Sequence, residues 1–161
     1  MAGKKGLNVN MKELEDKILL DGKVKPGGIL KVDSFLNHQI DPQLLYNMAV
    51  ELKRLYEGSG VNKILTVESF THGGSNMIMV SKEYLGPDDC VLIVDDFLAT
   101  GAALIGLKAI CEQAGAKIAG AGIAIEKVFQ GGGNLLRAEG MRIESLAKIT
   151  TMSDNGLEFE K

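Results

Sequence analysis

The chain has 161 residues, 45% hydrophobic and 24% charged, a composition that predicts one globular domain with a core of its own. Its formal net charge of -3 offers no basic surface to a polyanion, so nucleic acid is excluded as an expected partner. No apolar run approaches the ~20 residues that span a bilayer, which excludes a membrane protein, and we expect a cytoplasmic protein in which Cys90 and Cys111 are free thiols.

The amino-terminal third predicts a helix followed by a short strand. Residues 1–9 show no periodicity and are expected to form a disordered leader, which leaves 10–161 as a single domain. Asn10 can cap a helix that ends near Gly22, because an apolar stripe at helical spacing follows it. The alternating segment 27–35 then predicts a half-buried strand.

A second helix is predicted to begin at Asp41–Pro42. The acid can serve as the N-cap, and a proline is favoured at the first helical position because the N–H group it lacks has no partner within the helix there. The buried face of this helix is expected to consist of Leu44, Leu45, Met48, Leu52 and Leu55. After the helix, residues 62–69 predict a strand.

Strands and a helix alternate in the remainder of the chain. Strands are predicted over 88–96, 116–127 and 141–149, a helix over 102–113, and a closing edge strand over 157–160. Continuous apolar strands joined by helices indicate an α/β domain with a central, mostly parallel sheet flanked by helices. In such folds ligands bind outside the carboxyl ends of the strands.

One segment, VLIVDDFLATGAAL at 91–104, combines features of a binding site. Its small-residue loop leads directly into a helix, where unpaired first-turn N–H groups favour an anion such as a phosphate monoester. The alternative for this loop is an ordinary strand-to-helix turn. The candidate phosphate-binding residues are Ala99, Thr100, Gly101, Ala102 and Ala103.

Two adjacent acids, Asp95 and Asp96, precede this loop at the predicted strand end. Adjacent carboxylates repel each other, but they can accept hydrogen bonds from vicinal hydroxyls or face a cation. Phosphate donors beside hydroxyl acceptors describe a site for a ribose 5-phosphate, whereas the alternative is that the acids only cap the loop.

Other phosphate-binding motifs do not fit. A P-loop needs a lysine where this chain has Leu107, and the segment 120–125 lacks the third glycine of a dinucleotide fingerprint. A phospho-acceptor receiver domain is excluded because Asp154, the next aspartate after the pair, is too near the chain end.

The four apolar residues, two acids and small-residue loop resemble the signature of the type I phosphoribosyltransferases, which bind phosphoribosyl pyrophosphate (PRPP). The segments 30–42, 91–103, 120–130 and 142–149 are similar to the bacterial members that act on xanthine. The resemblance implies the type I fold with a small hood. It also implies transfer of a phosphoribosyl group from PRPP to N9 of xanthine in purine salvage, with Mg²⁺ bound to the pyrophosphate and with the chain acting as a homodimer.

Carried over by position, the resemblance implies that Asp95 and Asp96 hold the ribose hydroxyls and the loop 99–103 holds the 5′-phosphate. The purine-binding positions it implies are Leu30, Asn37 and Lys127, and Phe129 could stack on the ring. Without the resemblance these four would be a core leucine, a turn residue, a solvated lysine and a packed aromatic ring. His38 and His72 have no metal-ligand spacing and are expected to be surface groups.

The sequence departs from the family pattern near Ser69–Phe70. There the family has a pyrophosphate-binding loop, a helix and a strand, whereas this chain passes directly to 70–85, which resembles the returning half of the hood. Either the sequence omits residues that the protein has, or this is a deletion variant with impaired chemistry. A third reading is a non-catalytic PRPP-binding module like that of the purine repressors, although too few residues precede the first strand for a winged helix.

Overall fold

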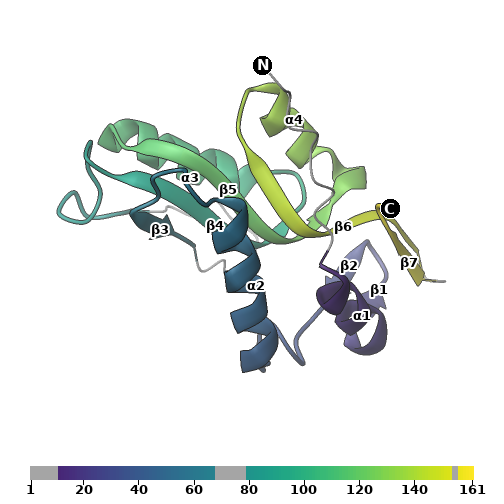
Figure 1. Cartoon of the computed structure of the whole chain (residues 1–161). Coiled ribbons are helices and arrows are strands. Elements are labelled where there is room, and N and C mark those ends of the chain that lie inside the picture. The colour runs from purple at the N-terminus through teal and green to yellow at the C-terminus, as the bar shows by residue number, and fades with distance from the viewer. Residues whose placement is uncertain (1–10, 68–78, 154–155) are drawn as a thin grey trace, which may run out of the picture.

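The computed structural model describes residues 11–67, 79–153 and 156–161, and the described residues form a five-stranded sheet and a separate two-stranded hairpin (Figure 1). The large sheet has the order β3-β4-β5-β6-β7; its first four strands are parallel and β7 is antiparallel to β6. Its strands are β3 (Lys63–Leu65), β4 (Cys90–Leu98), β5 (Lys117–Lys127), β6 (Ile143–Ser153) and β7 (Gly156–Phe159).

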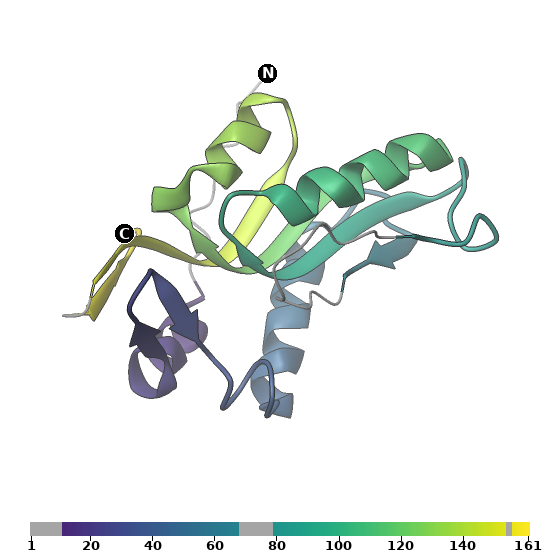
Figure 2. The same cartoon turned by 180° about the vertical axis from the view of Figure 1, so that it is seen from behind.

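Helices cover both faces of this sheet. The helix α2 crosses in front of the sheet in Figure 1, whereas α3 lies in front in the opposite view of Figure 2. One core cluster joins α1, α2 and the hairpin to β5 and β6, and a second joins α3 and α4 to β4 and β5. The remaining elements are α1 (Lys12–Asp21), β1 (Lys23–Lys25), β2 (Ile29–Lys31), α2 (Pro42–Leu55), α3 (Ala102–Ala114), the 3-10 turn η1 (Val128–Gln130) and α4 (Gly132–Ala138).

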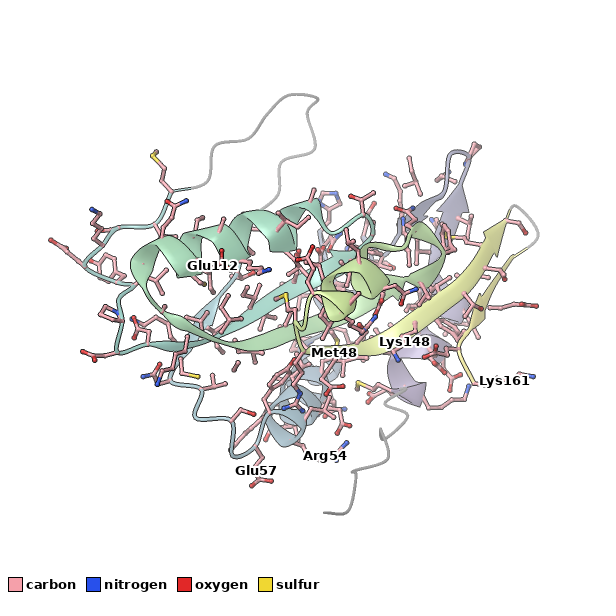
Figure 3. All side chains as sticks on the ribbon, turned by 90° about the horizontal axis from the view of Figure 1, so that it is seen from above. Met48, Arg54, Glu57, Glu112, Lys148 and Lys161 are labelled. Atoms are coloured by element: carbon pink, nitrogen blue, oxygen red, sulfur yellow. The ribbon has the colours of Figure 1, made fainter. Side chains whose placement is uncertain are left out.

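The helix α2 begins as predicted. The side chain of Asp41 accepts hydrogen bonds from the backbone N–H groups of Gln43 and Leu44, at 3.2 and 3.1 Å, and Pro42 occupies the first helical position. Met48 of this helix is packed in the core, whereas Arg54 near its end is exposed; both side chains are labelled in Figure 3. The prediction that Leu45 is buried is wrong, because its side chain is 44% exposed.

Other boundaries also differ from those predicted. The N-cap of α1 is Met11 rather than Asn10, because the N–H of Met11 is held by the carbonyl oxygen of Leu146 on β6 at 2.7 Å. The strand expected over 27–35 is only three residues long, and within the described part of the chain it pairs with the equally short β1, which the sequence did not predict. The expected leader, 1–9, lies outside the described residues.

Candidate functional site

The acidic pair lies inside the last part of β4 rather than beyond its end. Asp95 is paired in register with Ile123 of β5, and the strand continues for two residues after Asp96. Val94 and Phe97 both pack against the same core cluster although they are three residues apart, so the regular alternation of sides is interrupted at the two acids. The strand therefore ends irregularly where the carboxylates stand.

The carboxylates replace part of the strand's hydrogen bonding. Oδ1 of Asp95 accepts the N–H of Asp96 at 2.9 Å, and Oδ1 of Asp96 accepts the N–H of Phe97 at 2.8 Å. Burial, and then the adjacent Asp96, raise the pKa of Asp95 to about 7. Asp95 is half-buried and Asp96 is exposed. The site thus holds one carboxyl that titrates near neutrality beside one that is open to solvent.

The small-residue loop leads into α3 as predicted. Gly101 is its N-cap residue with a φ of 87°, a left-handed conformation that glycine adopts without strain. No side chain caps α3 among the described residues, so its first-turn N–H groups are left for another acceptor. Leu104, Leu107 and Cys111 anchor the helix in the core behind the loop. The loop can accept an anion against a rigid helix.

Lys127 is the last residue of β5 and lies between two other elements. Its Nζ atom donates to the carbonyl oxygen of Gly28, in the β1–β2 turn, at 2.8 Å. The same atom lies 5.5 Å from the centroid of the ring of Phe97, the residue that follows the acidic pair in the sequence. Burial lowers the pKa of Lys127. The lysine therefore joins the hairpin to the strand that carries the acids.

The other predicted purine-binding residues occupy different environments. Leu30 is 5% exposed and belongs to the core cluster, which is the packing role expected of it without the family resemblance. Asn37 is exposed in the turn between β2 and α2, as is His38 beside it. Phe129 lies in η1, two residues after Lys127, with 46% of its surface exposed. The structure thus brings Lys127 and Phe129 to one strand end, while Asn37 makes no hydrogen bond to either of them among the described residues.

The sequence analysis missed α4 and the polar cluster behind it. The carboxylate of Glu126, 1% exposed, accepts two hydrogen bonds of 2.7 Å from Arg137 and a further one from Ser145. Gly132, the first residue of α4, donates its N–H to the carbonyl oxygen of Ala99 at 3.1 Å. The sequence signal that could have revealed this cluster is Glu126, a single acid near the end of an apolar strand, followed eleven residues later by Arg137.

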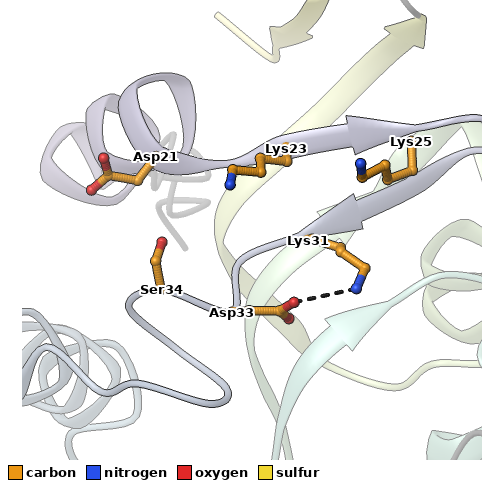
Figure 4. A pocket seen from close by; sticks show the side chains of 6 residues that line it. All are labelled: Asp21, Lys23, Lys25, Lys31, Asp33 and Ser34. Carbon is orange, nitrogen blue, oxygen red and sulfur yellow. Dashed lines mark hydrogen bonds and ion pairs between the residues drawn. The ribbon is translucent and has the colours of Figure 1, made fainter.

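A cavity of about 290 Å³ lies apart from these residues, beside the hairpin (Figure 4). Its charges are partly balanced, since Lys31 approaches Asp33 at 3.4 Å. It is lined by Asp21, Lys23, Lys25, Lys31, Asp33 and Ser34. None of the predicted site residues lines it.

Within the described ranges, no group of three or more His, Cys, Asp and Glu side chains could hold a metal ion, and no helix is long and apolar enough to cross a membrane. The carboxylates of Asp95 and Asp96 are still oxygen donors of the kind Mg²⁺ prefers. The predicted departure at Ser69–Phe70, and His72, lie outside the described residues.

Comparisons with solved structures show the fold. Adenine phosphoribosyltransferase from Thermoanaerobacter pseudethanolicus superposes with a TM-score of 0.66 at 18% identity, over 84% of this chain and 99% of that one. The enzyme from Giardia lamblia, complexed with 9-deazaadenine, gives 0.64 at 21% identity, over 84% and 97%. The predicted type I phosphoribosyltransferase fold is therefore confirmed.

Comparison of sequences also shows that part of the relatives has no counterpart here. The xanthine phosphoribosyltransferase of Limosilactobacillus reuteri (strain DSM 20016) is 42% identical over 190 residues, covering 94% of this chain and 100% of the relative. Because 94% of 161 residues is about 151, about 39 of the 190 aligned positions are empty in this chain. This agrees with the predicted loss of a few dozen residues.

The family is decided by the curated relatives, since no family model matches the chain. The xanthine phosphoribosyltransferase of Heliobacterium modesticaldum is 46% identical over 187 residues, covering 92% of this chain and all of the relative. That of Lactiplantibacillus plantarum is 42% identical over 188 residues, covering 92% and 96%. With the acidic pair, the small-residue loop and the fold all in agreement, this chain belongs to the xanthine phosphoribosyltransferase family of pentosyltransferases.

Proposed function

We propose that the chain transfers the phosphoribosyl group of PRPP to N9 of xanthine, giving xanthosine 5′-monophosphate and pyrophosphate. The observation that carries this proposal is the convergence at one sheet edge of the Asp95–Asp96 pair, the loop into α3 and Lys127. These three features supply, in order, acceptors for ribose hydroxyls, donors for a phosphate and a cationic donor for the oxygens of an oxopurine.

The phosphate end of the substrate is assigned to the residues Ala99, Thr100, Gly101, Ala102 and Ala103. Their backbone N–H groups lie at the positive end of α3, and the left-handed conformation of Gly101 (φ 87°) lets the loop turn into that helix. Thr100 is exposed and adds a hydroxyl donor. A 5′-phosphate fixed here would leave the ribose beside Asp95 and Asp96.

The carboxylates then act on the charge that develops during transfer. Loss of pyrophosphate leaves a positively charged, oxocarbenium-like ribose, which fixed negative groups such as Asp96 stabilise more in the transition state than in the ground state. Mg²⁺, bound with the pyrophosphate, would neutralise the leaving group. No covalent intermediate with the protein is required.

Purine recognition is assigned to Lys127, with Phe129, Asn37 and Leu30 around it. The half-buried ammonium of Lys127 can donate to an exocyclic oxygen of xanthine, which a purine lacking oxygens would not satisfy. Phe129 presents an exposed ring one turn beyond the strand, where it can stack on the base.

The empty positions in the alignment favour a second candidate, a deletion variant that binds the 5′-phosphate half of the substrate and turns over slowly. The family's pyrophosphate loop is expected to lie in the missing segment, so the departure of pyrophosphate would lose its support. A non-catalytic PRPP-binding module would give the same binding without any turnover.

A spectroscopic assay with xanthine, guanine and hypoxanthine, each with PRPP and Mg²⁺, separates these candidates. Turnover of xanthine supports the first proposal, and PRPP binding without turnover supports the others. A chimera that receives the corresponding segment of the Limosilactobacillus reuteri relative between Ser69 and Phe70 is the matched control. If the chimera turns over xanthine at least about 100-fold faster than the natural chain, the deletion impairs the chemistry.

A cytoplasmic location and a homodimeric state belong to the same proposal. The resemblance to dimeric relatives is what supports the homodimer. Light scattering at micromolar concentration tests the dimer, and a mass near 17.2 kDa would contradict it.

A further inference from the structure

An ion pair with a buried carboxylate and a half-buried arginine lies behind the start of α4. Glu126, on β5, is 1% exposed, and its two carboxylate oxygens each accept a hydrogen bond of 2.7 Å from Arg137 on α4. The hydroxyl of Ser145, on β6, donates to the same carboxylate. Three elements are therefore tied to one carboxylate, and a bidentate pair of this kind fixes orientation as well as distance.

The pair is held together by electrostatics. Burial would raise the pKa of Glu126, but the hydrogen bonds from Arg137 and Ser145 outweigh burial and lower that pKa below its ordinary value. The same contact raises the pKa of Arg137. Because a buried carboxylate without its partner is strongly unfavourable, Arg137 is not free to leave, and α4 cannot shift along the sheet.

The first residues of α4 lie between this pair and the proposed phosphate loop. A Cβ atom at Gly133 would overlap the carboxylate of Glu126, and one at Gly132 would overlap the backbone of Ala99 and Thr100. The N–H of Gly132 donates to the carbonyl oxygen of Ala99 at 3.1 Å. The two glycines therefore place helix backbone in direct contact with the ion pair on one side and the loop on the other.

We propose that Arg137 is a positioning residue for the 5′-phosphate: through Glu126 it fixes the start of α4, and α4 fixes the loop 99–103 in the conformation that receives the phosphate. This inference rests on the proposed function, since it concerns the same loop. Both terminal nitrogens of Arg137 donate to the carboxylate of Glu126, so we assign Arg137 a positioning role and no contact with substrate.

The test compares Arg137→Met with the natural chain by calorimetric titration with ribose 5-phosphate. A loop displaced by a fraction of an ångström loses alignment with the phosphate, and we expect the affinity to fall at least about 10-fold. Hydrogen exchange of the amides of 99–103 should accelerate, while that of α2 stays unchanged. Arg54→Met, which removes an arginine from an exposed pair with Glu51, should change neither quantity.

Two further variants keep the inference testable if Arg137→Met does not fold. Arg137→Lys keeps the charge but loses the bidentate geometry, so its affinity should lie between those of the natural chain and the methionine variant. Gly132→Ala leaves Glu126, Arg137 and Ser145 in place and displaces the loop directly, so it should weaken ribose 5-phosphate binding as well.

The outcomes separate this inference from the proposed function. If the natural chain does not bind ribose 5-phosphate, the proposed phosphate site is wrong and the inference is overturned with it. If the natural chain binds and folded Arg137→Met binds equally well with unchanged exchange at 99–103, only the inference is overturned. A lower melting temperature with unchanged affinity would mean that the ion pair serves stability alone and would equally overturn it.

Discussion

The Nζ atom of Lys127 lies 2.8 Å from the carbonyl oxygen of Gly28, a residue 99 positions earlier in the chain. This hydrogen bond holds the turn of the β1–β2 hairpin against the carboxyl end of β5. The same ammonium lies over the ring of Phe97, which follows the acidic pair. If Lys127 binds the purine as proposed, the base would lie beside the turn of the β1–β2 hairpin.

Replacing Lys127 with methionine should weaken the binding of xanthine more than the binding of PRPP. Loss of one hydrogen bond from a charged donor costs about 1.5–3 kcal/mol, so the KM for xanthine should rise by about 10- to 100-fold. The fold should persist, because the contacts of the Lys127 side chain with other described residues include only one hydrogen bond to a turn and the face of Phe97. Steady-state kinetics with Lys53→Met, an exposed lysine on α2, as the control would check this. An unchanged KM would remove Lys127 from the purine site.

The parallel sheet could be predicted from the sequence because its strands carry their own signal. Residues 91–94 are continuously apolar, which suits a strand covered on both faces, and Asp41–Pro42 and Gly115 mark helix ends through local backbone chemistry. The position of the acids and the loop at the carboxyl end of β4 followed from these two signals. Apolar periodicity and helix capping depend on neighbouring residues only, so a single sequence is enough to recognise them.

The supporting contacts could not be predicted, because they depend on packing between distant segments. The strand β1 is three residues long with two lysines, and α4 begins with two glycines, a pattern that local propensity assigns to a loop. Tertiary contacts hold this helix, since Leu136 is buried and Arg137 is paired with Glu126. Its glycines are required by close approach, because a Cβ at Gly133 would overlap Glu126 and one at Gly132 would overlap the backbone of Thr100. Nothing near Gly28 in the sequence indicates that Lys127 is its partner.

The substitution Asp96→Asn should lower turnover without unfolding the protein. Asp96 is exposed, and an asparagine Oδ1 can still accept the N–H of Phe97, so the strand end should keep its hydrogen bond. The missing charge no longer stabilises the cationic ribose, and kcat should fall about 100-fold. Asp88→Asn, an exposed acid just before β4, is the control. Kinetics identical to those of the natural chain would refute the assignment of the ribose site.

The contribution of Asp95 to the free energy of unfolding should fall as the pH rises from about 4 to about 7. Burial and the neighbouring Asp96 raise its folded-state pKa from 3.8 to about 7, so in this range the folded chain binds a proton that the unfolded chain has released. The contribution is full below the unfolded pKa and is lost as the pH passes the folded one. After allowance for partial solvent screening, we expect about 1–2 kcal/mol.

Urea unfolding of the natural chain and of Asp95→Asn at pH 5 and pH 8 measures this contribution. The variant has no carboxyl at position 95 to titrate, so its loss of stability between the two pH values should be smaller by that amount. Equal losses in both proteins would show that Asp95 titrates at its ordinary value. The comparison between variants removes the contributions of all other groups that titrate in both.

The last prediction concerns Tyr56, which secures the end of α2 to the sheet at β5. Its hydroxyl donates to the carbonyl oxygen of Ala121 at 2.8 Å, and Arg142 lies 4.4 Å from its ring centroid. Burial raises the pKa of Tyr56, so the phenol remains a donor throughout the ordinary pH range. Tyr56→Phe keeps the ring but leaves a buried carbonyl without that donor, which should cost about 1–2 kcal/mol.

For a chain of this length, that cost corresponds to a fall in melting temperature of about 2–8 °C, measurable by calorimetry. Tyr84→Phe is the matched control, since Tyr84 is 68% exposed and its loss should leave the melting temperature unchanged. Ribose 5-phosphate affinity should be the same in both variants, because Ala121 lies six residues before Lys127 on β5, away from the carboxyl edge. If Tyr56→Phe melts at the natural temperature, the carbonyl oxygen of Ala121 must gain another donor, and the buried phenol would then contribute packing alone.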